Sequence, residues 1–424
     1  MPVYCNVMPG MLYLSNTFYF TVRGFWFMRS FEEYRQLAID ILRPSQRDLE
    51  HGLELHKNSF VFDAYGFMPR NSACPDMTGL ITSGASRDEL TWRSEEFSMN
   101  SAFNDPAMVQ KLKDAWEFAG VDVIFQNSGM EGNDIEVFLR RMSCYTHIVD
   151  KLPEIYDRAV FPHQLTEIWK RGKKALYMTT NGVPLSCKYT SVADQLMYIE
   201  IFAKLGIRMM HLTYNRRNLI GDGCAEEANA GLSDFGKQVI AEMNRVGVIP
   251  DCAHSGLRTS YDAAKCSTKP VVASHAVAGG LSTHYRSKTD EVIQAIKETG
   301  GYVGICAHAP FLQHEMNIKT FIDHIDYVAR KFGVDHVAIG TDHGISLGAG
   351  VSAYRPNPAR PIWESYWRKP GAGIAPEMRD GHDSMSWINW PMFTVGLVQR
   401  GYTDDEIRKI IGGNVLRVCE ETLS

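Results

Sequence analysis

The stretch from Val246 to Arg286, VGVIPDCAHSGLRTSYDAAKCSTKPVVASHAVAGGLSTHYR, decides the fold of this chain. It holds two short apolar runs, 246–249 and 271–274, and each run leads into a histidine, His254 or His275. A helix-compatible segment lies between the two runs. This order of strand, histidine, helix, strand and histidine is typical of βα barrel units, which place ligands at the C-terminal ends of their strands.

The two histidines are candidate metal ligands. A neutral imidazole is a good ligand for zinc and related ions, and imidazoles from adjacent strands can converge on one ion. The alternative is a pair of partly buried histidines that donate hydrogen bonds to backbone carbonyls. Because His254 and His275 take matching positions in consecutive strand–helix units, we favour the metal site.

Strand-like runs alternate with helical patterns on both sides of this stretch. Eight runs stand out, at 60–63, 121–125, 175–179, 208–213, 246–249, 271–274, 302–306 and 336–340. Helical patterns follow most of them, for example at 135–151, 191–205, 289–299 and 322–332. Eight such alternations predict an α/β fold, a (β/α)8 TIM barrel. A doubly wound open sheet is the alternative, but no GxGxxG motif follows any strand.

The segments around the barrel divide into an N-terminal part and a barrel domain. We predict an N-terminal extension with helices at 1–57, in which two amphipathic helices are separated at Pro44. The barrel then covers 58–424 and ends in C-terminal helices. A long polar insertion at about 68–118 and a proline-rich segment at 344–383 are expected to form loops at the barrel mouth.

Composition restricts the classes of partner. The net charge is -5 without any basic block, which argues against nucleic acid or an anionic membrane surface as a partner. Nine scattered cysteines without a CxxC pair fit a reducing compartment. The first 27 residues are apolar but interrupted by polar residues, and they lack the features of a signal peptide. We therefore expect a soluble, cytoplasmic protein.

Other side chains at predicted strand ends could take part in chemistry. Asp342, after the last strand, could bind a metal or take a proton, or it could simply cap the following turn. Arg286 could hold a substrate carboxylate, or it could be a solvated arginine. His308 could be a ligand, a substrate contact or a core histidine, and we rank the core first. His284 and His343 are weaker candidates.

Six motifs in a fixed order point to a known family. They are GIRMMHLT at 206–213, GLSDFG at 231–236, DCAHS at 251–255, SH at 274–275, VDHVAIGTD at 334–342 and GNVLRV at 413–418. From about residue 58 to 420 the chain resembles the membrane (renal) dipeptidase family, zinc peptidases built on an amidohydrolase-type barrel. The resemblance implies that His254 and His275 bind metal. It also implies that Arg286 receives the substrate carboxylate and that Asp342 handles the catalytic proton.

The chain departs from this family at three strands. The family pattern Asp-Gly-His-x-Asp on the first strand supplies two ligands, and here Tyr65 and Phe67 replace them. A bridging glutamate on the third strand is replaced at, or next to, Asn181. A substrate-contacting histidine after the fourth strand is replaced by Tyr214. Since a binuclear site needs carboxylates to balance its charge, these changes argue for one metal in place of two.

Three hypotheses follow from these residues. The first is a divergent dipeptidase-like hydrolase that acts on a small amide or peptide-like substrate bearing a carboxylate. It would use one zinc or other divalent ion on His254 and His275, with Asp342, Tyr65 or His308 as third ligand. The second is metal-free chemistry on a small carboxylated metabolite, and the third is a binding protein without catalysis.

The roles expected in the first hypothesis are specific. Asp342 and Tyr65 are the catalytic candidates, while Arg286, Tyr214 and Asn181 are the candidates for substrate contact. A tyrosine hydroxyl is a reasonable proton donor when a cationic neighbour lowers its pKa. The resemblance also implies a homo-oligomer, most simply a homodimer.

Overall fold

The computed structural model describes residues 29–71, 76–129, 132–186, 191–347 and 374–423. The predicted N-terminal extension up to residue 28 and most of the proline-rich segment at 344–383 lie outside these ranges. Across the described residues, no helix has both the length and the apolar character that crossing a bilayer requires.

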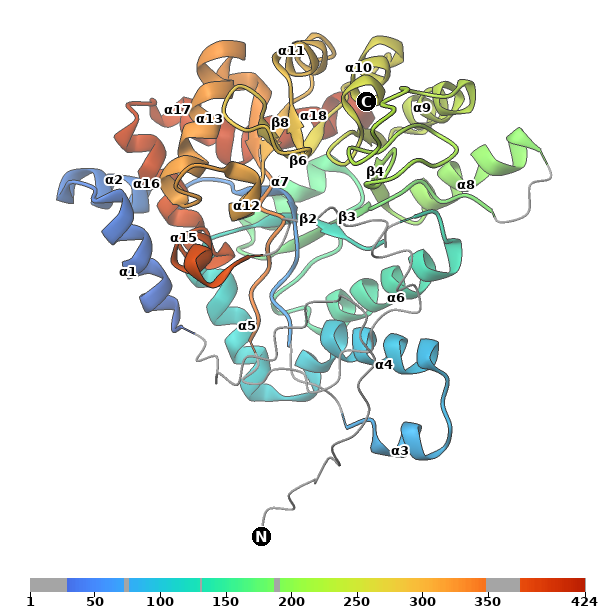
Figure 1. The fold of residues 1–424 in the computed structure, drawn as a ribbon. Coiled ribbons are helices and arrows are strands. Elements are labelled where there is room, and N and C mark those ends of the chain that lie inside the picture. Colours follow the sequence, from blue (N-terminus) through green and yellow to red (C-terminus); the bar gives the residue numbers. More distant parts are fainter. Residues whose placement is uncertain (1–28, 72–75, 130–131, 187–190, 348–373, 424) are drawn as a thin grey trace, which may run out of the picture.

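Eight parallel strands and one two-residue strand form the centre of the molecule (Figure 1). One sheet has the order β1-β2-β3-β4-β5, with β1 (Phe62–Gly66), β2 (Val123–Asn127), β3 (Ala175–Thr180), β4 (Ile207–His211) and β5 (Ile249–Asp251). The other has the order β7-β6-β8-β9, with β6 (Ala273–Ala278), β7 (Ser287–Lys288), β8 (Val303–Ile305) and β9 (Val337–Ile339). All eight predicted strands are present, but the strand predicted at 246–249 begins only at Ile249, because Val246 still belongs to the preceding helix and Gly247 caps that helix with φ 76°.

Hydrogen bonds at both seams close the two sheets into a barrel. A parallel bridge joins the end of β5 to the residue before β6. On the other side, the Asp342 N–H donates to the Tyr65 carbonyl at 2.9 Å, and the Phe67 N–H donates to the His343 carbonyl at 2.9 Å. The chain after β9 thus continues alongside β1, and the predicted (β/α)8 barrel is confirmed.

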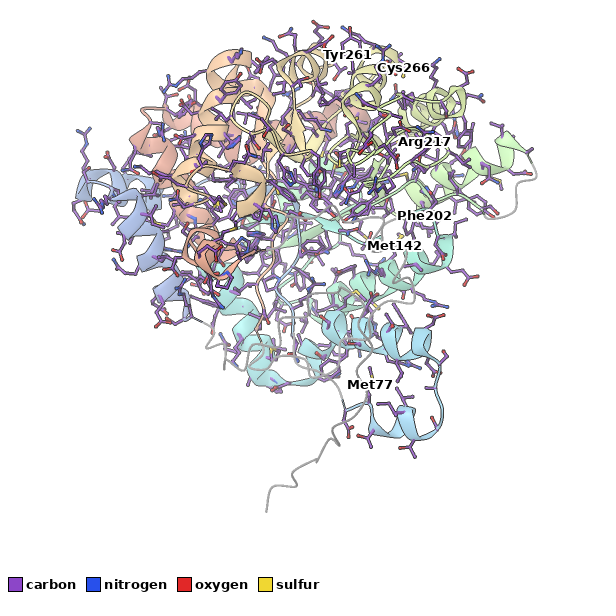
Figure 2. The ribbon with its side chains drawn as sticks, viewed as in Figure 1. Met77, Met142, Phe202, Arg217, Tyr261 and Cys266 are labelled. Carbon is purple, nitrogen blue, oxygen red and sulfur yellow. The ribbon has the colours of Figure 1, made fainter. Side chains whose placement is uncertain are left out.

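Helices cover the outside of the barrel (Figure 1). They are α1 (Phe31–Leu42), α2 (Gln46–Lys57), α3 (Thr78–Thr82), α4 (Arg87–Asn100), α5 (Pro106–Ala119), α6 (Ile135–Lys151), α7 (Pro162–Lys170), α8 (Val192–Lys204), α9 (Asp234–Val246), α10 (Leu257–Cys266), α11 (Asp290–Glu298), α12 (Ala309–Leu312), α13 (Ile318–Phe332), α15 (Arg379–Ser384), α16 (Trp390–Gln399), α17 (Asp404–Arg408) and α18 (Asn414–Leu423). An apolar layer between α6 and α8 includes Met142 and Phe202 (Figure 2).

Local sequence signals explain where several helices begin. The N-terminal helices separate at Pro44 as predicted, and the Ser45 side chain caps the start of α2. Ser233 is the N-cap of α9, and its side chain accepts a hydrogen bond from the Gly236 N–H.

The insertion at 68–118 is more regular than its composition suggests. It contains α3, α4 and α5, where the polar and turn-rich sequence predicts loops. The polar residues instead lie on exposed or half-buried helix faces, and Glu95 on α4 accepts hydrogen bonds from Arg141 on α6 at 2.8 Å and 3.2 Å. Whether this insertion caps the barrel mouth stays a prediction, as does the division at residue 57.

The N-terminal helices are attached to the C-terminal part of the chain. A Cβ atom added at Gly52 on α2 would lie 2.7 Å from Val395 on α16, so the two helices touch where this glycine stands. Beside it, the buried His56 Nδ1 lies 2.8 Å from Thr394 Oγ1. The pair α2 and α16 therefore forms one packed unit on the barrel wall.

Candidate metal centre and active site

The carboxylate of Asp251 fixes the backbone on which His254 and His275 stand. Its Oδ1 atom accepts hydrogen bonds from the Ala253 N–H at 2.8 Å and the Ser274 N–H at 3.0 Å. These two donors immediately precede the two histidines in the chain. Because the same oxygen holds both segments, the ends of β5 and β6 are kept in register, and both histidines are buried.

The two imidazoles face each other through their Nε2 atoms, 3.0 Å apart. His254 Nδ1 lies 2.8 Å from Asn215 Oδ1, an oxygen that can only accept, so this Nδ1 carries the proton. His275 Nδ1 lies 2.8 Å from Ser274 Oγ, a hydroxyl that can either donate or accept. The proton on Nδ1 of His254 leaves its Nε2 with a lone pair that is directed at Nε2 of His275.

This arrangement fits a shared cation. A cation bound by both Nε2 atoms, 3.0 Å apart, can take the place of a proton shared between them. Tetrahedral zinc with Zn–N bonds of about 2.0 Å holds its nitrogens about 3.3 Å apart, so only a small opening of the pair is needed. Burial lowers the pKa of His254 and His275 well below the ordinary value, and the charge of Arg286 lowers it further. Both rings are therefore neutral, as metal ligands must be.

A third histidine, which sequence reasoning did not select, stands beside the pair. His211 ends β4, and its Nε2 lies 2.7 Å from Asp251 Oδ2 with both side chains fully buried. Neither ring nitrogen of His211, nor that carboxylate oxygen, has a partner in hydrogen-bond geometry among the described residues. Ligand atoms of His211, Asp251 and His275 lie within 4.8 Å of one another. This group is the natural source of a third metal ligand.

The electrostatics of Asp251 agree with this position. Burial acts to raise the pKa of its carboxyl group, but the charge of His211 and the hydrogen bonds from Ser274 outweigh burial and lower the pKa. Asp251 is therefore an anion in the barrel interior. It supplies negative charge next to a site where a cation would bind.

On the opposite side of the centre, two of the replaced family positions bind each other. The Tyr65 hydroxyl donates to Asn181 Oδ1 at 2.5 Å, and the Tyr65 ring stacks on His275 with ring centroids 3.8 Å apart. The half-buried Phe67 ring lies edge-on to Tyr65. A neutral phenol, a neutral amide and a phenyl ring thus take the places of charged ligands.

Arg286 lies fully inside the site rather than in solvent. Its side chain is 3% exposed; Nη2 donates to the His275 carbonyl at 2.8 Å and Nε donates to the Ala253 carbonyl at 3.3 Å. Burial acts to lower its pKa, but nearby acidic groups, including Asp342, raise it. Among the described residues, no hydrogen bond is made by Nη1. That part of the guanidinium can receive a carboxylate.

Asp342 and Tyr214 flank the same centre. Asp342 has a left-handed backbone with φ 56°, a conformation that few residues other than glycine adopt, and its N–H is held by the Tyr65 carbonyl at 2.9 Å. Tyr214 stacks on His254 with ring centroids 4.1 Å apart. The structure therefore brings Tyr65, Asn181, Tyr214 and Arg286 around the histidine pair, and their roles stay predictions.

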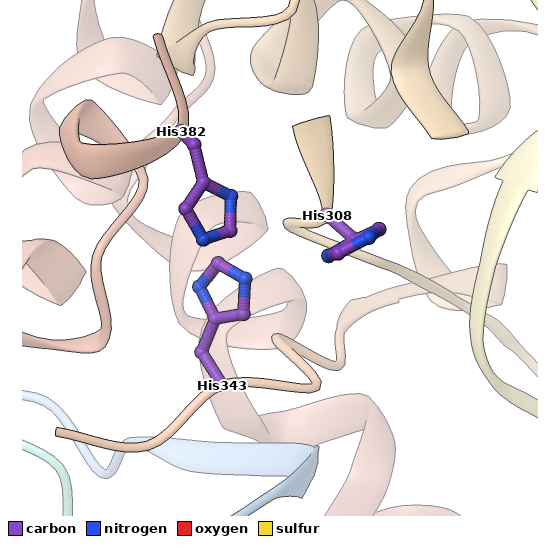
Figure 3. Close-up of side chains that lie close together, drawn as sticks. All are labelled: His308, His343 and His382. Atoms are coloured by element: carbon purple, nitrogen blue, oxygen red, sulfur yellow. The ribbon is translucent and has the colours of Figure 1, made fainter. Parts of the chain in front are cut away.

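His308 lies elsewhere at the barrel mouth. The sequence favours a buried core position for His308. The structure instead leaves its side chain half-buried, next to His343 and His382 (Figure 3). Since its ring belongs to this separate group, it is not placed as the third ligand of the His254–His275 pair. In the sequence, His343 is only a weak candidate for a functional residue, and no pattern marks His382 as one.

A parallel barrel with buried imidazoles, a carboxylate and a guanidinium at its strand ends defines the class of metal-dependent hydrolase barrels. The model of the membrane dipeptidase family (Peptidase family M19) matches residues 89–354. The chain belongs to this family of dipeptidase-like hydrolases.

Curated relatives carry the same family name. The chain is 28% identical over 284 residues to the dipeptidase tcpJ of Claviceps purpurea, which covers 65% of this chain and 58% of that protein. It is 27% identical over 281 residues to the dipeptidase verJ of Clonostachys rogersoniana, which covers 64% of this chain and 63% of that protein. The matched region thus spans about three fifths of the length of these relatives.

Solved structures share the fold. An amidohydrolase from Pseudomonas aeruginosa superposes with a TM-score of 0.64 at 23% identity, covering 88% of this chain and 99% of that one. The probable dipeptidase PvdM from Pseudomonas aeruginosa gives a TM-score of 0.62 at 19% identity, covering 89% and 99%. At these sequence identities, the structural similarity supports the barrel fold and not a shared function.

Proposed function

We propose that this chain hydrolyses an amide bond in a small, peptide-like substrate that carries a free carboxylate. The reaction would depend on one divalent metal ion, zinc in the simplest case, bound by His254 and His275. Family membership supports the hydrolase class. The observation that carries the proposal is the convergence of two buried, neutral imidazoles whose Nε2 atoms lie 3.0 Å apart.

The third ligand would come from the His211–Asp251 pair. These side chains are buried next to His275, and their facing atoms lack hydrogen-bond geometry among the residues that the structure describes. A bound ion of this kind supplies Lewis-acid polarisation of a carbonyl group and lowers the pKa of water. Two of the three alternatives considered from sequence have other contacts, since Tyr65 bonds to Asn181 and His308 lies with His343, and the third, Asp342, has a different role in this proposal.

The surrounding residues would bind and orient the substrate. Arg286 would pair its Nη1 with the substrate carboxylate while Nη2 and Nε remain on backbone carbonyls. Asp342 would accept and return the proton that amide hydrolysis moves, since its carboxylate lies near the guanidinium. Tyr65 would act as a proton donor, and Tyr214 and Asn181 would contact the substrate.

The experiment is a comparison of metal content and activity. Protein dialysed without chelator is analysed for metals and assayed on a panel of dipeptides and N-acyl amino acids. His275→Ala is expected to lose one ion per chain and at least about 100-fold of the activity, since truncating a zinc ligand removes the Lewis acid. His163→Ala, at an exposed position on α7, is the matched control and should change neither quantity.

Activity that survives both chelation and His275→Ala would overturn the metal-dependent proposal. It would favour the second candidate, metal-free chemistry on a small carboxylated metabolite. The neutral Tyr65–Asn181 pair, in the place of charged ligands, is the observation that supports this candidate. Binding of such a metabolite without turnover would point to the third hypothesis, a binding protein.

We also propose a cytoplasmic homo-oligomer. Family resemblance supports the oligomer, and the scattered cysteines support a reducing compartment as the location. Size-exclusion chromatography with light scattering tests the first point, and microscopy of the tagged full chain in its host cell tests the second.

A further inference from the structure

Three histidines from distant parts of the chain meet at the barrel mouth. His308 follows β8, His343 follows β9 and His382 lies on α15. Each offers one ring nitrogen, and these nitrogens all lie within 4.8 Å of one another. Figure 3 shows the three rings converging from their separate elements. We call them the mouth histidines.

Their backbones are held by packing that does not involve the imidazoles. The His343 carbonyl accepts the Phe67 N–H at 2.9 Å, which ties it to the end of β1. A Cβ atom at Gly381 would lie 2.4 Å from the Met316 carbonyl oxygen, so the chain beside His382 approaches its neighbour as closely as only glycine allows. The first N–H of α13 donates to Ser384 Oγ at 3.0 Å. The site is therefore preorganised.

Two of the three side chains, His343 and His382, each have one buried ring nitrogen without a hydrogen bond to the described residues. His343 Nδ1 lies 3.2 Å from the Met385 carbonyl oxygen, so Nδ1 carries the proton and Nε2 carries the lone pair. This buried Nε2, and the buried Nδ1 of His382, make no hydrogen bond to any described residue. A buried polar atom without a hydrogen bond destabilises the fold, and a bound ion would offset that cost.

The three rings are suited to share an ion. The rings of His343 and His382 cross at 71°, with centroids 4.6 Å apart, and His308 stands nearly perpendicular to both, with centroids 6.5 Å and 5.7 Å away. None of the three therefore stacks on another and blocks its edge. Burial, followed by the neighbouring imidazoles, lowers the pKa of His343, and burial lowers that of His382 to about 4. Neutral rings are competent ligands at pH 7.

We propose that the mouth histidines bind one divalent transition-metal ion of the zinc class, at a site separate from the His254–His275 pair. Three imidazole donors suit zinc, copper or nickel, whereas magnesium and calcium require oxygen ligands. Three histidines with an open fourth position resemble the ligand set of catalytic rather than structural zinc. A carbonyl behind His343 Nδ1 is the outer-sphere partner that ligating histidines commonly have.

This site changes how a metal count is interpreted. Two ions per chain would not mean that the family's adjacent pair has survived, because one ion would belong to the barrel centre and one to the mouth. The two sites share no ligand, so each can be removed without the other.

The test uses the full-length protein and cobalt(II) as an optical probe, together with zinc in equilibrium dialysis. In a His275→Ala background, which removes the central site, one ion per chain is expected to remain. Adding His343→Ala or His382→Ala should abolish that ion or weaken its binding at least about tenfold, with loss of the cobalt absorption bands. His163→Ala in the same background is the control and should leave the stoichiometry unchanged.

Glutamine variants guard against loss of folding. His343→Gln and His382→Gln keep most of the volume and the hydrogen-bonding capacity but do not offer an imidazole. Melting curves like that of the parent, combined with loss of the ion, support the site. An unchanged zinc stoichiometry and cobalt spectrum in both glutamine variants would show that the mouth histidines bind no metal, whatever the activity of the central site.

Discussion

The two sides of the barrel interior differ in charge: one side contains ionised groups and the other is neutral. At the ends of β4, β5 and β6 stand three imidazoles, the anionic Asp251 and the buried Arg286. At the ends of β1 and β3, Tyr65 and Asn181 form a neutral hydrogen bond. The first side keeps groups that attract and balance a cation, whereas the second side has replaced its ligands by groups that satisfy each other.

The difference shows that a ligand set can be lost as a unit. A tyrosine alone in the place of a histidine would bury an unsatisfied hydroxyl, and an asparagine alone would bury an unsatisfied amide oxygen. Together they satisfy each other at 2.5 Å. The imidazoles of the charged side have their polar contacts with Asn215, Ser274 and Asp251, and Tyr65 meets His275 through ring stacking alone.

The largest expected effect is on metal stoichiometry. We predict that Tyr65→His, Phe67→Asp and Asn181→Glu together raise the metal content by one ion per chain, because they return two ligands and a bridging carboxylate. Elemental analysis after dialysis measures the metal content. The variants are made in a His343→Ala background, so that the mouth histidines do not contribute to the count. A metal content equal to that of the background, with an unchanged melting curve, would contradict the idea that these three residues are the missing ligands.

A second prediction concerns Arg286 on the charged side. Arg286→Ala is expected to raise KM at least about 30-fold for a substrate with a free carboxylate, since truncating one partner of a buried charge pair costs about 2–5 kcal/mol. Steady-state kinetics measure it. The amidated form of the same substrate is the control, for which parent and variant should be equal. An equal loss on both substrates would mean that Arg286 acts through structure alone.

A third prediction tests the neutral side. Tyr65→Phe should lower the free energy of unfolding by about 1–3 kcal/mol, because it leaves the buried Asn181 oxygen unsatisfied. The double change Tyr65→Phe with Asn181→Leu should recover most of the lost free energy of unfolding. Tyr302→Phe is the matched control, since its buried hydroxyl has no partner among the described residues. Urea unfolding measures the stability of all three variants. If Tyr302→Phe lost as much free energy of unfolding as Tyr65→Phe, the Tyr65–Asn181 hydrogen bond would not be the cause.

A fourth prediction concerns a pH dependence of stability that comes from Asp63 on β1. Burial raises the pKa of its carboxyl group to about 7, although Thr341 donates to it. The folded state thus holds a proton that the unfolded chain releases near pH 4, so this group stabilises the protein at low pH. Between about pH 4 and pH 7 the stability falls by up to about 1.4 kcal/mol per pH unit.

Asp63→Asn, which mimics the protonated carboxyl group, should flatten this part of the stability curve. Urea midpoints at pH 5, 6 and 7 measure the slope. A slope as steep as in the parent would show that Asp63 ionises normally in the folded state.

The barrel could be predicted from the sequence because its signals are local. Apolar runs and helical periodicity are properties of neighbouring residues, and the boundaries of α6 (Ile135–Lys151) follow from them without tertiary information. His254 and His275 were found because each stands just after such a run. Arg286 follows in the loop beyond β6, and its guanidinium reaches the His275 carbonyl, while its role in binding a carboxylate stays a prediction.

The remaining residues could not be found because their environment is tertiary. His211 lies inside an apolar strand and reads as a core residue until its unpartnered nitrogens are seen next to Asp251. The link between Tyr65 and Asn181 joins strands that are not neighbours in the barrel. His382 reaches His308 only because α15 folds back over the mouth.

The contact between α2 and α16 has a consequence for biosynthesis. Gly52 and His56 leave the ribosome long before Val395 and Thr394, which cover them in the finished protein. The buried face of α2 therefore remains uncovered through most of translation, exposed to aggregation and to proteolysis. We expect the nascent chain to engage a holding chaperone until its last helices emerge.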